Sequence, residues 1–392
     1  MKITDIQVHK VNLPLVTGFR WASGLYLGAT KGIVEIHTDE GIVGLGEVST
    51  PEQAELVDRE FTARLRGVDP LNIDDCYRRC MPEIRTLLNT HDAGLVKAFG
   101  GVEMALWDIK GKALNLPIYA LLGGPARPEI GVSEYFALRV PSASEAGEAT
   151  PLEVARYCAN MRGQYGSTLF EGKVGVVDLD TEIEMVREVR AAIGPDATLR
   201  LDANNSWPLN MARKALGRLE PYDIANIEDP APTYLDMAKL RQHSAIPFSS
   251  HLPDLRLTVE LGVPDTFVLN VVHLGGIRET AKFINACEVM EVGIWFYSGE
   301  TAFGTAAYMQ LAAAIPYLSQ PGQSLLRWYA DDVIAAPFQP RKNALPIPDG
   351  PGLGITLDAE ALERCKKRYE RDGVITQLGA PGETHYRRFT PQ

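Results

Sequence analysis

Two stretches of the sequence end a hydrophobic run with an acidic residue: Leu199-Arg-Leu-Asp202-Ala-Asn204 and Ile224-Ala-Asn-Ile-Glu228-Asp-Pro230. An earlier run, Thr168-Leu-Phe-Glu-Gly-Lys173, ends in a lysine in the same way. In a barrel of parallel strands, residues at the carboxyl ends of the strands gather at one mouth, where such barrels carry their active sites. The pattern therefore predicts a base and two metal-binding acids at the mouth of a barrel.

Short apolar strands alternate with amphipathic helices from Ile130 onwards. The expected strands cover residues 131–138, 168–175, 197–202, 224–228, 246–250, 266–271, 292–298 and 323–328. Their end residues follow one another at intervals of about 19 to 29 residues, near the roughly 30 per unit of a closed (β/α)8 barrel. The glycine fingerprint that a doubly wound sheet carries after its first strand is absent from the sequence. We predict an α/β fold built on a TIM-type barrel.

The first section of the chain does not show this alternation of strands and helices. Residues 3–13, 31–38 and 42–48 are typical of an antiparallel meander with a tight turn at Asp39-Glu-Gly41. Helical spacing then continues from Pro51 to about Leu122. We expect an α+β domain over residues 1–128, the barrel over 129–330, and a C-terminal segment, 331–392, that returns to the first domain.

Composition narrows the class of protein. The 392 residues are 45% hydrophobic and 23% charged, and the formal net charge is −11. This composition is globular, and the acidic balance disfavours a nucleic-acid partner, which needs clustered Lys and Arg. We expect no signal peptide, no membrane partner and a cytoplasmic location. The five cysteines show no CxxC pair, so buried thiols are expected and zinc is not indicated.

Two longer motifs carry a family resemblance. Ala98-Phe-Gly-Gly-Val-Glu-Met-Ala105-Leu-Trp-Asp108, continued by Leu116-Pro-Ile-Tyr-Ala-Leu-Leu-Gly123, resembles the first signature of the mandelate racemase and muconate lactonizing enzyme family. Residues 199–204 with Ile227-Glu228-Asp229-Pro230 resemble the second, and Asn204 with Trp207 resembles a run of the glucarate dehydratase branch. The family belongs to the enolase superfamily. The resemblance implies a modified (β/α)7β barrel under an α+β capping domain, Mg2+, removal of the proton α to a carboxylate, and a homo-oligomer.

The resemblance also implies a metal site. Asp202 and Glu228 match the first two metal ligands of the family, although acids after strands can also cap the following helices. His251 stands where the family has an acid or an asparagine as its third ligand. Mg2+ prefers oxygen ligands, whereas imidazole suits softer ions. His251 is therefore a ligand for Mn2+ or another transition metal, a base in its own right, or a loop residue hydrogen-bonded to its neighbours. The expected cofactor is Mg2+, with Mn2+ as the alternative that His251 introduces.

The residues expected to transfer protons depart from the family pattern. Lys173 matches the lysine that removes the proton, but Glu171 replaces the other lysine of the Lys-x-Lys motif. A neighbouring carboxylate raises the pKa of a lysine, so Lys173 could instead form only a salt bridge with Glu171. Asn270 holds the place of the sixth-strand acid or lysine, and the seventh strand ends without the histidine of a His-Asp dyad. Two-base racemization is therefore disfavoured.

The remaining candidate residues concern the substrate. We expect Lys173 and Tyr297 to be catalytic. The predicted loop at residues 17–26 offers Arg20 and Trp21 to a sugar acid, or packs its aromatics on the cap. The full set of expected substrate-binding residues is Arg20, Trp21, Glu171, Asn204, Asn270, Ser298 and Glu300. The predicted function is a hydro-lyase, an acid sugar dehydratase; the alternatives are a cycloisomerase of an acid sugar lactone and a barrel that only binds its ligand.

Overall fold

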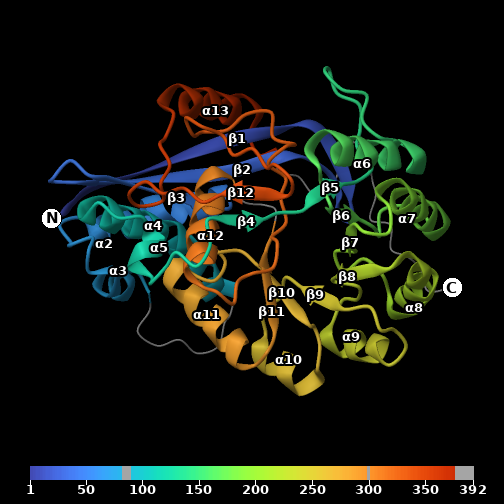
Figure 1. The fold of residues 1–392 in the computed structure, drawn as a ribbon. Helices are drawn as coiled ribbons and strands as arrows, with labels where there is room; N and C mark the ends of the chain where they lie inside the picture. The colour runs from blue at the N-terminus through green and yellow to red at the C-terminus, as the bar shows by residue number, and fades with distance from the viewer. Residues whose placement is uncertain (82–89, 298–300, 376–392) are drawn as a thin grey trace.

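A sheet of parallel strands forms the centre of the computed structural model, which describes residues 1–81, 90–297 and 301–375 (Figure 1). The strands are β5 (Glu134–Phe136), β6 (Leu169–Lys173), β7 (Thr198–Asp202), β8 (Ile224–Glu228), β9 (Phe248–Ser250), β10 (Thr266–Leu269) and β11 (Gly293–Phe296). They are hydrogen-bonded in the order β11-β10-β9-β8-β7-β6-β5. This curled parallel sheet confirms the predicted α/β fold with a TIM-type barrel.

The eighth position of the barrel is filled by a short segment and not by the strand expected at 323–328. The backbone of Gly322 bonds to Gly131 (3.0 Å) and Ser133 (2.8 Å), and the N–H of Gln323 donates to Phe296 O (2.7 Å). The chain turns over residues 326–328. That prediction was wrong because the segment bridges the first and last strands with only two residues. The first expected strand, 131–138, is likewise divided between β4 (Glu129–Gly131) and β5.

Helices follow the strands and cover the outside of the barrel (Figure 1). They are α6 (Pro151–Tyr165), α7 (Leu179–Ile193), α8 (Leu209–Leu219), α9 (Tyr234–Arg241), α10 (Leu255–Leu261), α11 (Ile277–Val289) and α12 (Ala302–Ala314). Local signals set their ends: α6 begins with a capping box of Thr150 and Glu153 and ends at Gly166, whose φ is +67°. All residues of α12 are buried, as its nearly apolar sequence requires.

The cap combines a meander with helices from both ends of the chain. Its strands are β1 (Ile3–Trp21), β2 (Gly24–Thr38) and β3 (Val43–Val48). Its helices are α1 (Pro51–Leu56), α2 (Thr62–Leu65), α3 (Ile73–Cys80), α4 (Thr90–Leu114), α5 (Ile118–Leu121) and α13 (Ala359–Asp372), with a π-helical turn at Val57–Phe61. Helix α13 packs on β1 (Figure 1), and β12 (Ala344–Pro346) pairs with β4. The exact division at residues 128 and 330 stays a prediction.

The expected loop at residues 17–26 is instead the far end of the hairpin between β1 and β2. Its register runs from Phe19 opposite Tyr26 to Trp21 opposite Gly24. Phe19 packs against Tyr135 of the first barrel strand, with ring centroids 6.4 Å apart, and against Trp328 at 5.3 Å. This aromatic cluster gives the segment a buried face that holds it as a strand and places Trp21 over the barrel mouth.

Two further sequence predictions can be compared with the fold. All five cysteines are buried and free of disulfides, as expected. None of the described helices is long and apolar enough to cross a membrane.

Candidate active site

A cavity of about 230 Å3 opens at the carboxyl ends of the barrel strands, under the hairpin end that carries Trp21. Its lining residues are Trp21, Lys173, Asp202, Asn204, Glu228, His251, Pro253, Val268, Leu269, Asn270, His273, Leu274, Tyr297 and Gln323. The structure thus brings together eight of the residues that the sequence singled out. They are Trp21, Lys173, Asp202, Asn204, Glu228, His251, Asn270 and Tyr297.

The predicted base and the first two acids lie side by side because three neighbouring strands end in register. Lys173 pairs with Asp202 across β6 and β7, and Asp202 pairs with Glu228 across β7 and β8. All three are buried, with 8%, 1% and 3% of their surfaces exposed. Parallel pairing in register points side chains at equal depth to the same face, so one lysine and two carboxylates share the barrel mouth.

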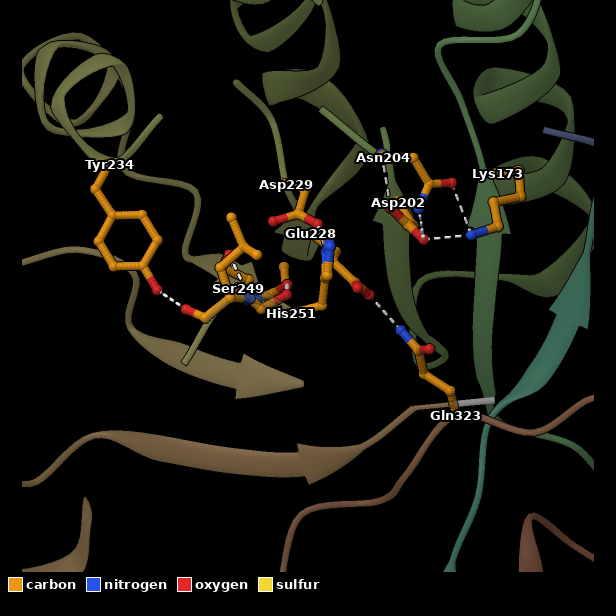
Figure 2. Close-up of polar contacts among 12 residues, drawn as sticks. Lys173, Asp202, Asn204, Glu228, Asp229, Tyr234, Ser249, His251 and Gln323 are labelled. Carbon is orange, nitrogen blue, oxygen red and sulfur yellow. Dashed lines mark hydrogen bonds and ion pairs between the residues drawn. The ribbon is translucent and has the colours of Figure 1, made fainter. Parts of the chain in front are cut away.

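Lys173 is held by Asp202, the last residue of β7, and by Asn204 just beyond it (Figure 2). Its Nζ forms an ion pair with Asp202 and donates to Asn204 Oδ1 at 2.8 Å. It also lies 5.7 Å from the ring centroids of both Trp21 and Tyr135. Burial opposes the charge of the ammonium, but the carboxylates around it, above all Asp202, outweigh burial and raise its pKa. Lys173 is therefore a charged group whose ion-pair partner is Asp202.

Glu171 lies one layer below the cavity and is not among the described residues that line it. Its Oε1 accepts a hydrogen bond of 2.6 Å from Gln323, and Arg200 Nη1 lies 3.9 Å from its Oε2. Burial, with 1% of the residue exposed, raises the pKa of Glu171 to about 7, and Arg200 opposes that rise. The residue that replaces the family's lysine thus turns toward Arg200 and Gln323, away from the position expected for a substrate contact.

Gln323 was not singled out by the sequence. Its Nε2 donates to both Glu171 and Glu228, so each of its amide hydrogens serves one carboxylate. Figure 2 shows the contact between Gln323 and Glu228. Burial first, and then the carboxylates of Asp202, Asp229 and Glu171, raise the pKa of Glu228 well above its ordinary value. The site therefore holds more negative charge than its described cations balance.

His251 and Asp229 form a second pair beside Glu228 (Figure 2). Nδ1 of His251 contacts Oδ2 of Asp229, a residue that is completely buried. The other oxygen of Asp229 is buried without a hydrogen-bond partner. One ligand atom each from Glu228, Asp229 and His251 lie within 4.8 Å of one another. Crowded carboxylates, an unpartnered buried oxygen and an imidazole are a donor set that fits a divalent cation.

The wall opposite Lys173 combines one expected contact with an unexpected histidine. Strands β6 and β10 are four positions apart around the barrel, so the residues after β10 face those of β6. Asn270 Oδ1 accepts from the backbone of His273 (3.1 Å), while its Nδ2 is buried and unpartnered. His273 stacks on Tyr297 with centroids 6.4 Å apart. Sequence spacing places His273 beyond the strand, and only the turn after β10 brings it back to the cavity.

Besides Glu171, Arg20 is a predicted substrate contact that the structure does not bring to the cavity wall. Arg20 precedes Trp21 in β1 and bonds through its backbone to Leu138 O at 2.8 Å, and it is not one of the described lining residues. Ser298 and Glu300 lie outside the described residues.

Comparisons with known proteins agree with this architecture. A model of the enolase C-terminal domain-like family matches residues 153–361, and a model of the mandelate racemase / muconate lactonizing enzyme N-terminal domain matches 3–123. Cis-3-hydroxy-L-proline dehydratase of Roseibium aggregatum is 30% identical over 389 residues, 94% of this chain and 100% of the relative. A probable glucarate dehydratase of Streptomyces coelicolor is 27% identical over 373 residues, 88% and 86% of the two chains.

Solved structures agree as well. The structure of an enolase from Thermobispora bispora complexed with magnesium and formate has a TM-score of 0.86 and 28% identity, and the match covers 96% of this chain and 95% of that one. Relatives of similar identity also include cycloisomerases and a racemase. Both domain models match, and the Roseibium aggregatum relative matches over its full length. Together with the barrel geometry, these matches show that the chain belongs to the mandelate racemase / muconate lactonizing enzyme family of the enolase superfamily.

Proposed function

We propose that this protein is a metal-dependent hydro-lyase that removes water from a sugar acid. The observation that carries the proposal is the array of Lys173, Asp202 and Glu228 on three successive strand ends in one buried cavity. The dehydratase names of two relatives that span most of the chain support the same reaction class. The Mg2+ in a solved relative supports the choice of cofactor.

A proton next to a carboxylate is weakly acidic, so its removal requires positive charge close to the enolate that forms. Asp202, Glu228 and His251 would hold a divalent cation at the cavity wall, and that cation would supply electrostatic stabilization of the enolate. The buried ammonium of Lys173 and the amide of Asn204 add polar groups at the same edge. We propose Asp202, Glu228 and His251 as the metal ligands, with Mg2+ or Mn2+ as the ion.

The proton transfers fall to residues of the cavity wall. With a cation on Asp202, the charge of the Lys173 ammonium is opposed and its pKa is lowered, so that the neutral amine becomes available as a base. Neutral Lys173 then accepts the α proton, and the electrons of the C–H bond pass into the enolate. The bond between the β carbon and its hydroxyl then breaks as the C=C bond forms. Lys173 or Tyr297 returns a proton to the departing oxygen, so that water leaves and an enol remains. The unpartnered Nδ2 of Asn270 would donate to a substrate hydroxyl.

Product analysis tests this proposal. Purified protein with Mg2+ or Mn2+ is incubated with a library of aldonic and aldaric acids and their lactones, and products are identified by NMR. We expect a 2-keto-3-deoxy acid from at least one acyclic acid. A lactone opened or closed without loss of water would make the enzyme a cycloisomerase. Absence of product and of deuterium exchange across the library would leave a barrel that only binds its ligand.

A substitution of Gln323 tests whether its hydrogen bonds to Glu171 and Glu228 strengthen metal binding. Gln323→Met keeps the length of the side chain but removes the N–H groups that serve Glu171 and Glu228. Loss of such outer-shell partners typically weakens metal binding about 10–100-fold, and we expect this for Mg2+ in isothermal titration calorimetry. Gln242→Met, at an exposed position after α9, is the matched control. Unchanged Mg2+ affinity in Gln323→Met would contradict a positioning role.

A further inference from the structure

The imidazole in the metal site distinguishes this chain from a site built on oxygen alone. Asp202, Glu228 and His251 line the cavity, whereas Asp229 is completely buried and is not among the described lining residues. Asp229 contacts Nδ1 of His251, so Nε2 is the ring nitrogen that remains for a metal, and His251 itself lines the cavity. The order from the protein interior is therefore the buried carboxylate of Asp229 and then the imidazole of His251, which lines the cavity.

This order fixes the tautomer of a neutral imidazole. A carboxylate accepts the proton of Nδ1–H, so the lone pair lies on Nε2. Carboxylate, imidazole and metal form a recurrent triad in metalloproteins, where the carboxylate orients the ring and makes it a stronger ligand. The backbone also fixes Asp229, because its N–H donates to Ser249 O at 2.8 Å and its carbonyl accepts from Asn205 N at 2.9 Å.

We propose that Asp229 and His251 make this site selective for a first-row transition ion such as Mn2+ or Co2+ over Mg2+. The inference rests on the proposed metal site and goes further by naming its selectivity. Mg2+ binds oxygen ligands and gains little from imidazole, whereas affinity for nitrogen donors rises from Mn2+ through Co2+. Nε2 of His251 is the only imidazole nitrogen that we assign to the metal, and Asp229 acts through it as a positioning residue.

Two substitutions distinguish the role of His251 as a metal ligand from the role of Asp229 as the residue that positions it. His251→Asn replaces the nitrogen ligand by an amide oxygen. Asp229→Asn removes the negative charge behind the ring, and asparagine tolerates the left-handed backbone at this position, where φ is +45°. His243→Asn, at an exposed position, is the matched control. Circular dichroism and thermal unfolding establish that each variant is folded.

Metal binding is measured with Mg2+, Mn2+ and Co2+ alone by isothermal titration calorimetry, and Mn2+-loaded protein is examined by pulsed electron paramagnetic resonance. In the wild type we expect Co2+ and Mn2+ to bind at least about 10-fold more tightly than Mg2+, with nitrogen modulation in the Mn2+ spectrum. His251→Asn should lose that modulation and most of the selectivity. Asp229→Asn should weaken Co2+ binding about 10–100-fold and affect Mg2+ less.

The results that overturn the inference are distinct from those that overturn the proposed function. Equal affinities for Mg2+ and Mn2+ in the wild type, or a Mn2+ spectrum without nitrogen, would contradict the selectivity while leaving a metal site at Asp202 and Glu228. Equal losses for all three ions in His251→Asn would also contradict it. Metal binding that survives both Asp202→Asn and Glu228→Gln unchanged would instead contradict the proposed metal site itself.

Discussion

Replacing Lys173 by methionine is expected to lower turnover by roughly 10²–10⁴-fold, the range that a positioned acid–base group contributes. Methionine fills a similar volume but can neither accept nor donate a proton. Exchange of the substrate's α proton with D2O should fall in parallel, because both measurements depend on removal of that proton. Turnover is followed by formation of the keto acid, and exchange by loss of the α-proton signal in NMR.

The same variant should keep its metal affinity, which distinguishes a lost base from a disrupted site. Lys173 is the ion-pair partner of Asp202, so methionine leaves this buried carboxylate without its cation. Unpaired buried charges are costly, so the metal-free variant should unfold at a lower temperature, and added Mg2+ should restore part of the difference. Lys239→Met, in an exposed ion pair on α9, is the control. Full turnover by Lys173→Met would contradict its role as the base.

Asp202→Asn and Glu228→Gln are expected to weaken Mg2+ or Mn2+ binding by more than about 100-fold, beyond the 10–100-fold typical of outer-shell partners. Each change keeps the shape of the side chain and removes one of two adjacent buried charges. Loss of the Glu228 charge relieves repulsion among the carboxylates that raise its pKa, so Glu228→Gln should be no less stable than the wild type without metal. Asp202→Asn leaves the buried ammonium of Lys173 without its ion-pair partner, so this variant should unfold at a lower temperature than the wild type. Calorimetric titration and thermal unfolding with and without metal measure both effects.

Asp223→Asn provides a matched control for these two variants. Asp223 is exposed, and its φ of +50° is a backbone conformation that asparagine adopts readily. We expect its metal affinity and turnover to equal those of the wild type. Unchanged metal affinity in both Asp202→Asn and Glu228→Gln would contradict the metal site.

The barrel and the positions of the predicted base and the two acids were predictable because the sequence patterns that indicate them are local. A short hydrophobic strand that ends in Asp202 or Glu228 places its acid at the mouth whatever the rest of the chain does. The positions of Lys173, Asp202 and Glu228 therefore followed from strand length and parallel pairing alone.

The supporting residues could not be predicted, since their partners lie far away in sequence. Gln323 reaches Glu171 across 152 positions from a two-residue bridge that has no strand pattern. Asp229 is separated from His251 by 22 positions, and it lies in the expected motif without a local sign that it would hold the histidine. The hairpin end at Trp21 was mistaken for a loop because its buried face depends on Tyr135 and Trp328, which belong to the barrel.

Solvent deuterium exchange is the most direct test of metal-dependent removal of an α proton in this cavity. Wild-type protein is incubated in D2O with each acid of the library, once with Mg2+ or Mn2+ and once with a chelator, and the α position is followed by NMR. We predict deuterium incorporation or elimination for at least one sugar acid with metal, and neither with chelator. Exchange that persists with chelator would contradict a metal-dependent reaction. Absence of exchange and elimination for every acid with metal bound would contradict removal of an α proton in this cavity.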